Sequence, residues 1–450
     1  MAEFHTSGTP QRVGLNEGRL TRTRAHVREA TEEGEEMAST HEVLIVGGGI
    51  GGLTLALQFE RAGIACRVLE AVPELKPLGV GINLLPHASK ELWDLGLQDR
   101  LAPIAVQTSQ SVFFNRFGQF IHADPAGTAA GYPWPQYSIH RGELQLMLAD
   151  ALRERLGEDT LTLDARAVGF EDHGDGVSVT TEDRDGNRTI HEGVVAIGCD
   201  GVHSVFRKLL HPNEGPLLYS GYTMWRGTTR MRSYLDGASM VRAGWLETGK
   251  LVVYPILDYD DGTQLINWVV EIEVPQRTNR DWNQIADDPF FMEPFKDWTF
   301  EWLDVPAMLN GAERAFEYPM VDQDALPFWT KGGVTLLGDA AHPMVPRGSN
   351  GAGQAILDTR ALTDALLREP DPRAALVHYE KERLPRTAQV VELNRVNPPD
   401  ALLREVYVRT GDNPFGDISE VITEEEISTL LENYRSVTGS SLQSLKGDAR

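Results

Sequence analysis

A glycine-rich turn stands between two short apolar runs near the start of the chain. Residues 43–71 read VLIVGGGIGGLTLALQFERAGIACRVLEA. Residues 43–46 have the length and apolar character of a buried parallel strand, 53–62 indicate a helix, and 66–69 predict a second strand. This order of strand, turn, helix and strand is typical of a βαβ unit.

The glycines of the turn have the spacing G-x-G-x-x-G. Gly47 allows the tight turn, Gly49 lets a pyrophosphate approach the backbone, and Gly52 lets the helix pack closely on the sheet. Glu70, at the end of the second strand, is placed to accept hydrogen bonds from a ribose. The alternative is an ordinary glycine-rich turn, which leaves the acid at the strand end unexplained. The stretch therefore predicts a dinucleotide site.

Charge and cysteine content exclude several classes of protein. The net charge of −24 argues against nucleic acid or an acidic membrane as a partner. The two cysteines, Cys66 and Cys199, fall in or beside predicted buried strands and are interpreted as packing thiols. No run is apolar enough to span a membrane and no secretory signal is visible, so we expect a cytoplasmic protein. We expect a monomer or a homodimer.

A chain of 450 residues is too long for one simple core. We expect an α/β fold in which a Rossmann-like FAD/NAD(P)-binding domain is interwoven with a β-sheet substrate domain and followed by C-terminal helices. The expected segments are a disordered extension (1–41), a discontinuous nucleotide domain (42–107, 137–215 and 325–395), a substrate domain (108–136 and 216–324) and a helical tail (396–450). Residues 222–274 are rich in β-branched and aromatic side chains, which predicts the sheet of the substrate domain.

Two further predicted strands end in acidic turns. One carries CDG at 199–201, and the other carries GD at 338–339. The second is followed by PRGSNGAGQAILD (346–358), a glycine loop that leads into a helix. A flexible loop is the alternative interpretation of these glycines. A dehydrogenase that uses a nicotinamide cofactor needs only the first glycine turn, so three such strand ends indicate a different protein class.

Together these three motifs resemble the FAD-dependent aromatic hydroxylases, the single-component flavoprotein monooxygenases. The segments LGVGIN, YSIHRGELQ, TMWRG, NWV, YPMVD and GDAAHPM are similar to phenazine-modifying members of that family, over about residues 42–395. The resemblance implies FAD as cofactor, NADH or NADPH as transient reductant, and O₂ and a small aromatic molecule as substrates. It also implies hydroxylation through a flavin C4a-hydroperoxide, accompanied in the phenazine enzymes by decarboxylation.

The resemblance assigns cofactor-binding residues by position. Reduced flavin is negatively charged near N1, and a helix that begins in 349–353 would stabilise this charge with its backbone N–H groups. Arg141 has an alternative role as a surface helix cap. The full implied set is Gly47, Gly49, Gly51, Gly52, Glu70, Ala71, Val80, Arg141, Val168, Asp200, Asp339, Ser349, Asn350, Gly351, Ala352 and Gly353.

Substrate is expected between the flavin and the β-sheet. Arg226 or Arg347 would pair with a substrate carboxylate, and the alternative for Arg226 is a contact with the nucleotide domain. For the aromatic residues the alternative is the core of the sheet. The predicted substrate residues are Trp225, Arg226, Tyr254, Trp268, Val345 and Arg347. Pro346 is assigned to the oxygen site by resemblance, His342 is not assigned as a base, and no metal is expected.

Two other functions stay open at this point. One is an FAD-dependent dehydrogenase or oxidase of a small molecule, and the other is a non-catalytic flavin-binding protein. Incorporation of oxygen into product separates the first from hydroxylation. Absence of any NAD(P)H oxidation stimulated by an aromatic compound favours the second.

Overall fold

The apolar run VLIV forms strand β1 (Val43–Val46), and all four residues are buried. β1 is the middle strand of a five-stranded parallel sheet with the order β19-β12-β1-β2-β8. The other strands are β2 (Cys66–Leu69), β8 (Leu161–Thr162), β12 (Val195–Gly198) and β19 (Val334–Leu336). Central strands of a parallel sheet are covered on both faces, which explains why β1 carries no polar residue. The strands predicted at 43–46, at 66–69 and before the two acidic turns are confirmed.

The computed structural model describes residues 42–275, 284–286, 289–396 and 400–447. They belong to one compact unit, residues 40–450. The extension expected over residues 1–41 lies outside the described residues.

Helix α1 (Ile50–Ala62) follows the glycine turn, as predicted, and ends at Gly63 in the left-handed conformation, with φ 72°. It packs against α4 (Arg141–Leu156) and α7 (Gly351–Arg368). α7 in turn contacts α2 (Pro86–Asp94) and α8 (Pro372–Val396). Two short helices, α3 (Gln98–Leu101) and α5 (Val205–Leu210), complete this part. The start of α7 lies beside the turn after β1, since a Cβ on Gly51 would lie 3.6 Å from the Ala355 side chain.

Two three-stranded antiparallel sheets flank the parallel sheet. One has the order β11-β10-β9, and its Val177 and Val179 share a core with Leu44 of β1. The other has the order β3-β7-β4. Their strands are β9 (Arg166–Asp172), β10 (Val177–Glu182), β11 (Arg188–Gly193), β3 (Gly81–Leu84), β7 (Gln136–His140) and β4 (Ala105–Thr108).

The β-rich stretch predicted over 222–274 forms the middle of an eight-stranded sheet, in the order β17-β18-β13-β16-β15-β14-β5-β6. An antiparallel hairpin of β5 and β6 supplies one edge of this sheet. One face packs on an aromatic core that includes Phe291, Phe295 and helix α6 (Val305–Asn310). The strands are β5 (Gln110–Phe114), β6 (Phe120–Pro125), β13 (Leu218–Arg232), β14 (Ser239–Trp245), β15 (Gly249–Asp258), β16 (Thr263–Glu273), β17 (Gln284–Ile285) and β18 (Ala315–Asp322).

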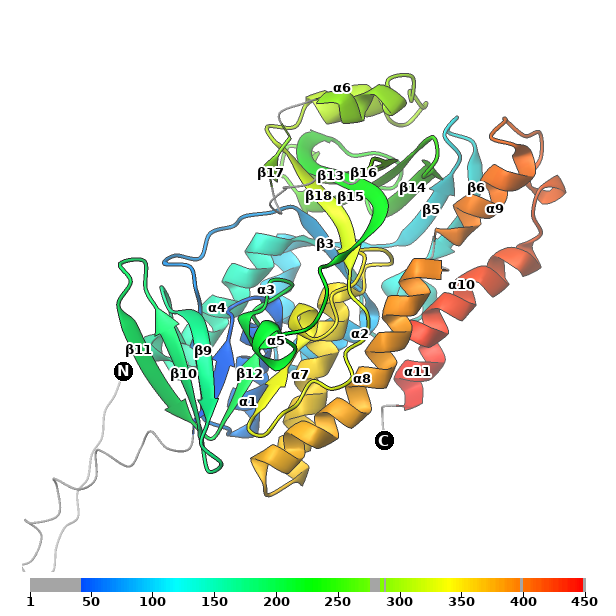
Figure 1. The fold of residues 1–450 in the computed structure, drawn as a ribbon. Coiled ribbons are helices and arrows are strands. Elements are labelled where there is room, and N and C mark those ends of the chain that lie inside the picture. The colour runs from blue at the N-terminus through cyan, green and yellow to red at the C-terminus, as the bar shows by residue number, and fades with distance from the viewer. Residues whose placement is uncertain (1–41, 276–283, 287–288, 397–399, 448–450) are drawn as a thin grey trace, which may run out of the picture. The chain divides into compact units, whose positions relative to one another are not determined.

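The C-terminal helices α9 (Ala401–Thr410), α10 (Glu424–Thr438) and α11 (Leu442–Gly447) pack on the rest of the unit. α10 begins with a capping box between Thr423 and Glu426. It lies beside α8, and its Leu431 shares a core with Phe113 and Ile121 of the β5–β6 hairpin (Figure 1). The tail is therefore attached both to the helices under the parallel sheet and to the eight-stranded sheet.

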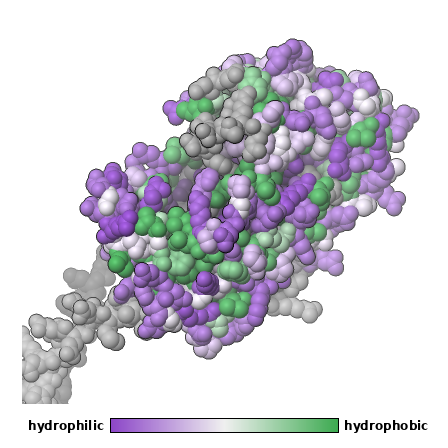
Figure 2. Space-filling model, viewed as in Figure 1, coloured by the Kyte–Doolittle hydropathy of each residue, from purple (hydrophilic) through white to green (hydrophobic). Residues whose placement is uncertain are grey.

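Among the described residues, no helix has both the length and the apolar composition needed to cross a membrane. On the face drawn in Figure 2, polar residues are interspersed with smaller apolar areas.

Candidate functional site

The turn between β1 and α1 is closed on one side and open on the other. Gly47 has φ 109°, and a Cβ there would lie 2.4 Å from the Cys199 carbonyl oxygen. A Cβ on Gly52 would lie 2.0 Å from the Gly47 carbonyl oxygen. A Cβ on Gly49 would meet no atom within 4 Å. The open side is where a pyrophosphate is expected.

Glu70 lies directly beside this turn. One carboxylate oxygen accepts a hydrogen bond from the Gly48 N–H (2.5 Å), and the other accepts one from the Val72 N–H (2.9 Å). The half-buried Ala71 follows it. Glu70 therefore fixes the backbone of the turn, and its contact with a ribose stays a prediction.

The start of helix α4 reaches the same turn. Arg141 is its exposed first residue, and the Arg141 N–H donates to the carbonyl of the buried Val80 (3.0 Å). Gln145 donates through Nε2 to the Gly48 carbonyl (2.7 Å). Residues i and i+4 of a helix share a face, so Arg141 and Gln145 both lie toward the turn. Gln145 is not among the residues predicted from the sequence, although its i+4 spacing from Arg141 is a signal that could have identified it.

Asp200 is engaged within its own segment. Its carboxylate accepts hydrogen bonds from the Ser204 hydroxyl (2.5 Å) and from the N–H groups of Val205 (2.7 Å) and Phe206 (3.3 Å), at the start of α5. Burial raises the pKa of Asp200, against the effect of these hydrogen bonds. The structure thus gives the Asp200 side chain a capping role, while the neighbouring Cys199 backbone closes the β1–α1 turn.

Asp339 follows β19 and faces solvent. The surrounding protein disfavours its charged form and raises its pKa, although His342 and Arg141 act in the opposite direction. A Cβ on Gly351, the first residue of α7, would lie 3.8 Å from the Asp339 carboxylate. The predicted residues Arg141, Asp339 and Gly351 are thereby brought together.

The segment 345–350, here named the proline loop, leads into α7. Pro346 is exposed, Val345 and Arg347 are buried, and Ser349 adopts a left-handed conformation with φ 60°. Asn350 precedes α7 without capping it by a side-chain hydrogen bond, and the first turn of α7, with Ala352 and Gly353, holds no acidic residue. The N-terminus of α7 thus offers unpaired N–H groups to an anion.

The C-terminal segment holds the proline loop in place. The Tyr434 hydroxyl of α10 accepts a hydrogen bond from Asn350 Nδ2 (2.5 Å) and donates one to Asn394 Oδ1 (2.8 Å). A Cβ on Gly348, where φ is 70°, would lie 1.7 Å from this hydroxyl. Gln354 Nε2 also donates to the Thr438 carbonyl (3.1 Å). No sequence pattern near the loop pointed to Tyr434, since it follows Asn350 by 84 residues.

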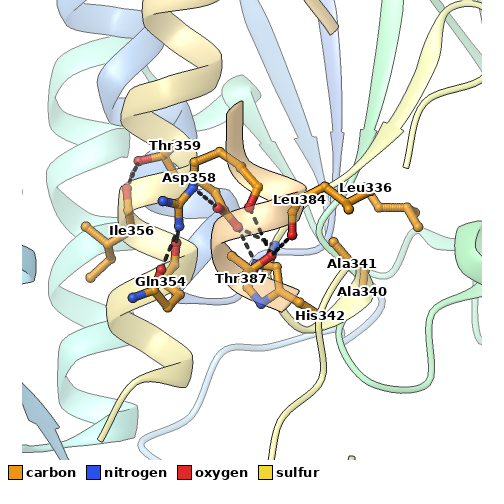
Figure 3. A network of polar contacts seen from close by, with 12 residues as sticks. Leu336, Ala340, Ala341, His342, Gln354, Ile356, Asp358, Thr359, Leu384 and Thr387 are labelled. Atoms are coloured by element: carbon orange, nitrogen blue, oxygen red, sulfur yellow. Dashed lines mark hydrogen bonds and ion pairs between the residues drawn. The ribbon is translucent and has the colours of Figure 1, made fainter. Parts of the chain in front are cut away.

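A buried polar network under the Gly338–Asp339 turn centres on Asp358 of α7 (Figure 3). Asp358 accepts hydrogen bonds from the Gly338 N–H (3.1 Å), from His342 Nε2 (2.6 Å) and from Arg383 Nε on α8 (2.7 Å). Burial favours the neutral form of Asp358, but His342 and Arg383 lower its pKa overall. The network gives His342 a carboxylate partner, Asp358.

His87 of α2 lies beneath the first turn of α7. Neither ring nitrogen has a hydrogen-bond partner among the described residues, and a Cβ on Gly353 would lie 2.9 Å from Nε2. Burial, and then the charge of Arg383, lower the pKa of His87 to about 4. His87 is therefore neutral at pH 7.

This buried histidine predicts an acid-sensitive stability. The pKa of His87 is about 4 in the folded chain and 6.5 in the unfolded chain. Between these two pH values the unfolded chain therefore binds more protons than the folded chain. Stability is therefore lost as the pH falls from 6.5 toward 4, by about 2 kcal/mol between pH 7 and pH 5. In urea titrations, His87→Gln is expected to remove this part of the pH dependence, whereas His378→Gln, at a half-exposed position on α8, is expected to keep it. Equal pH dependence in the wild type and His87→Gln would contradict the assignment.

The eight-stranded sheet turns one face toward the three-stranded sheet β3-β7-β4. Arg226 and the Tyr254 hydroxyl (2.8 Å) both donate to the Gly81 carbonyl of β3, and Asn267 Oδ1 accepts from the Gly81 N–H (2.7 Å). On the same face, Met224, Val269 and Met320 form with Val345 a small apolar cluster, here named the apolar patch. The proline loop therefore touches the sheet through Val345.

Trp225 and Trp268 lie on the other face of this sheet, which corrects their expected place beside the substrate. Both are fully buried, and both stack on Phe291, at ring-centroid distances of 5.4 and 6.3 Å. Successive residues of a strand point to opposite faces, so Trp225 and Arg226 do not face the same side. The core interpretation holds for these two tryptophans.

Val168 lies three residues beyond Ala165, whose N–H donates to the Glu70 carbonyl (2.8 Å). It is half-buried in β9, where the pairing with β10 shifts register. Gly51 contacts the GD segment, since a Cβ there would lie 3.1 Å from Leu337. Within the described part of the chain, no group of three or more His, Cys, Asp or Glu side chains has a metal-binding arrangement.

Known proteins share both the sequence and the fold. The family described as FAD binding domain matches residues 40–394. The chain is 42% identical to phenazine 1,6-dicarboxylic acid hydroxylase of Lysobacter antibioticus over 366 residues, which are 80% of this chain and 90% of that protein. It is 30% identical to 3-hydroxybenzoate 6-hydroxylase 1 of Aquipseudomonas alcaligenes over 371 residues, 79% of this chain and 88% of that protein.

Solved structures support the fold. A salicylate hydroxylase substrate complex has a TM-score of 0.66 at 22% identity, covering 89% of this chain and 98% of that chain. Klebsiella pneumoniae HpxO complexed with FAD and uric acid has a TM-score of 0.69 at 21% identity, covering 90% and 98%. The family match spans well over half of the chain, and the sequence relatives are matched over most of their length. The chain therefore belongs to the FAD-binding-domain family and is an FAD-dependent monooxygenase of that family.

Proposed function

We propose that the chain hydroxylates an aromatic or heteroaromatic acid with O₂ and NADH or NADPH, and that its substrate is of the phenazine carboxylate class. The relative from Lysobacter antibioticus, named for phenazine 1,6-dicarboxylic acid, supports this class. The single observation that carries the proposal is that the proline loop contacts both the predicted cofactor residues and the eight-stranded sheet. At one end the loop starts α7 beside Asp339, and at the other Val345 packs on the sheet.

The residues around the β1–α1 turn fit FAD. The open space at Gly49 is a cradle for a pyrophosphate, and the accessible Asp339 carboxylate is free to accept hydrogen bonds from ribityl hydroxyls. Asn350 Oδ1 is buried without a hydrogen-bond partner among the described residues. We assign Glu70 to the ribose, Arg141 to the dinucleotide, and residues 349–353 to the flavin ring. FAD supplies the electron transfer and oxygen activation.

The protein contributes orientation, electrostatics and exclusion of water. The first turn of α7 presents N–H dipoles that favour negative charge without a titratable group. The apolar patch offers a dry surface on which a planar ring can lie. Arg226 and Tyr254 donate to the Gly81 carbonyl and thereby fix the position of β3 beside the proposed substrate site. Pro346, exposed at the tip of the loop, is assigned to the oxygen side.

We extend the proposal to the division of labour along the chain. Residues 42–107, 137–215 and 325–395 hold the cofactor, and residues 108–136 and 216–324 hold the substrate. Residues 396–450 act in both parts, because Tyr434 contacts the proline loop while Leu402 and Leu403 pack with the β5–β6 hairpin.

Anaerobic flavin reduction tests the proposed function. The holoenzyme is mixed with NADH or NADPH, with and without each member of a panel that includes phenazine-1-carboxylate, phenazine-1,6-dicarboxylate and salicylate. We expect at least one phenazine acid to accelerate reduction strongly and to be hydroxylated under air. Bound FAD that no aromatic compound helps to reduce would contradict the proposal and favour a flavin-binding protein without this activity.

A further inference from the structure

A cluster of five charged side chains lies where the sheet, the proline loop and the C-terminal segment meet. Its members, here named the charge cluster, are Arg242, Lys250, Glu271, Arg347 and Asp400. Their side chains are only 2–11% exposed. Lys250 contacts Glu271 at 2.7 Å and also contacts Asp400, and Arg242 lies 3.2 Å from Asp400. Burial favours a neutral Asp400, but Lys250 and Arg242 lower its pKa overall, so it is charged.

The charge cluster contains one more cation than carboxylates. Three cationic side chains share the carboxylates of Glu271 and Asp400. Asp124 acts on the cluster from the hairpin side, but it is itself paired with Arg435 at 3.4 Å. Buried charges are normally paired, because removing an ion from water without a partner is costly. The excess positive charge therefore calls for an anion.

Arg347 is the member without a close partner. Its Nε and Nη2 are buried and make no hydrogen bond to the described residues. The nearest carboxylate oxygen, Glu271 Oε2, is 3.9 Å from Nε and also has no hydrogen-bond partner. The guanidinium lies 5.6 Å from the centre of the Tyr222 ring. A planar guanidinium with free N–H groups is suited to a carboxylate.

Arg226 differs from Arg347 in this respect. It donates to the Gly81 carbonyl, which also accepts from Tyr254, while the Gly81 N–H is held by Asn267. The Arg226 side chain therefore holds β3 in place through the Gly81 carbonyl. Arg347 instead follows Pro346 in the chain and lies near Tyr222, which packs on the apolar patch.

We propose that Arg347 binds the carboxylate of the aromatic substrate, and that the charge cluster is a carboxylate subsite completed by Asp400 from the C-terminal segment. The ring then lies on the apolar patch, and the carboxylate makes the cluster neutral, with three charges of each sign. Glu271 competes with the substrate for Arg347. The inference rests on the proposed function, since it names the chemical group by which that site selects its substrate.

Binding to the holoenzyme tests the inference without turnover. Flavin absorbance is titrated with phenazine-1-carboxylate and with the isosteric, neutral phenazine-1-carboxamide, and with salicylate and salicylamide as a second pair. We expect the wild type to prefer an acid to its amide by roughly tenfold or more, which is the size of one charge-assisted hydrogen bond. Arg347→Gln is expected to bring this ratio close to one. Glu271→Gln is expected to raise the affinity for the acid, a gain that misfolding does not produce.

The control is Arg230→Gln, which removes a surface arginine of β13 that pairs with Asp261 and lies outside the charge cluster. It is expected to keep the acid-to-amide ratio of the wild type. A ratio unchanged in Arg347→Gln, or a Glu271→Gln variant that binds the acid more weakly, would overturn the inference. So would an enzyme with reducible FAD that binds neither acid, and this outcome leaves monooxygenase chemistry on another substrate standing. A protein that does not retain FAD contradicts the proposed function itself.

Discussion

Gly49→Glu is expected to abolish FAD binding while the chain still folds. Gly49 has φ −77° and ψ −176°, a conformation open to any residue, and a Cβ there meets no atom within 4 Å. The new carboxylate would occupy the space predicted for the pyrophosphate. Two unit charges 4 Å apart at an effective dielectric constant of 20 repel by about 4 kcal/mol, roughly a thousandfold in Kd. FAD content after purification and fluorescence titration of the apoprotein measure the effect.

The control for this variant is Gly169→Glu. Gly169 lies in β9, also has open space at its Cβ position and does not have a left-handed φ. It is expected to bind FAD like the wild type. If Gly49→Glu binds FAD as tightly as Gly169→Glu does, the pyrophosphate does not lie at the β1–α1 turn, and the assignment of the glycines fails.

Asp358→Ala is expected to lower the free energy of unfolding by about 3–5 kcal/mol, because it leaves Arg383 buried without its carboxylate partner. The Arg383 side chain is 5% exposed and that of Asp358 is fully buried. The change also frees the Gly338 N–H and His342, so the Gly338–Asp339 turn loses its support. Urea unfolding of the apoprotein measures the stability, and FAD titration measures the consequence for the turn.

Asp364→Ala provides the comparison on the same helix. Asp364 pairs with Arg360 and Arg368, and its side chain is 33% exposed. Exposed ion pairs contribute about 0–1 kcal/mol, so this variant is expected to unfold almost like the wild type. Equal losses in the two variants would show that the Asp358 network is not the support of the turn.

The local patterns of the sequence predicted much of the site because each of them lies within a few residues of the chain. The glycines after β1, Glu70 at the end of β2, and the GD turn after β19 are all where the strand and turn patterns placed them. At position 52 only glycine fits, because a Cβ there would lie 2.0 Å from the Gly47 carbonyl oxygen. Gly47 and Gly52 are five residues apart, so a short motif is enough to reveal this requirement.

The rest came from contacts between distant segments. Tyr434 reaches the proline loop from α10, and Asp400 reaches Lys250 of β15 across 150 residues. Neither side chain belongs to a pattern that names its partner. The tryptophans are a different case. Trp225 and Arg226 are adjacent in one strand, and successive side chains of a strand point to opposite faces. The two residues therefore do not both face the substrate, and this conclusion follows from the sequence alone.

Incorporation of labelled oxygen tests the central claim most directly. The enzyme is supplied with ¹⁸O₂, with NADH or NADPH, and with the phenazine acid that accelerates flavin reduction. The mass of the aromatic product is then measured by mass spectrometry. A monooxygenase of this family should place one atom of ¹⁸O in each product molecule. A product that is oxidised without any label would contradict the account and identify the chain as a dehydrogenase or oxidase.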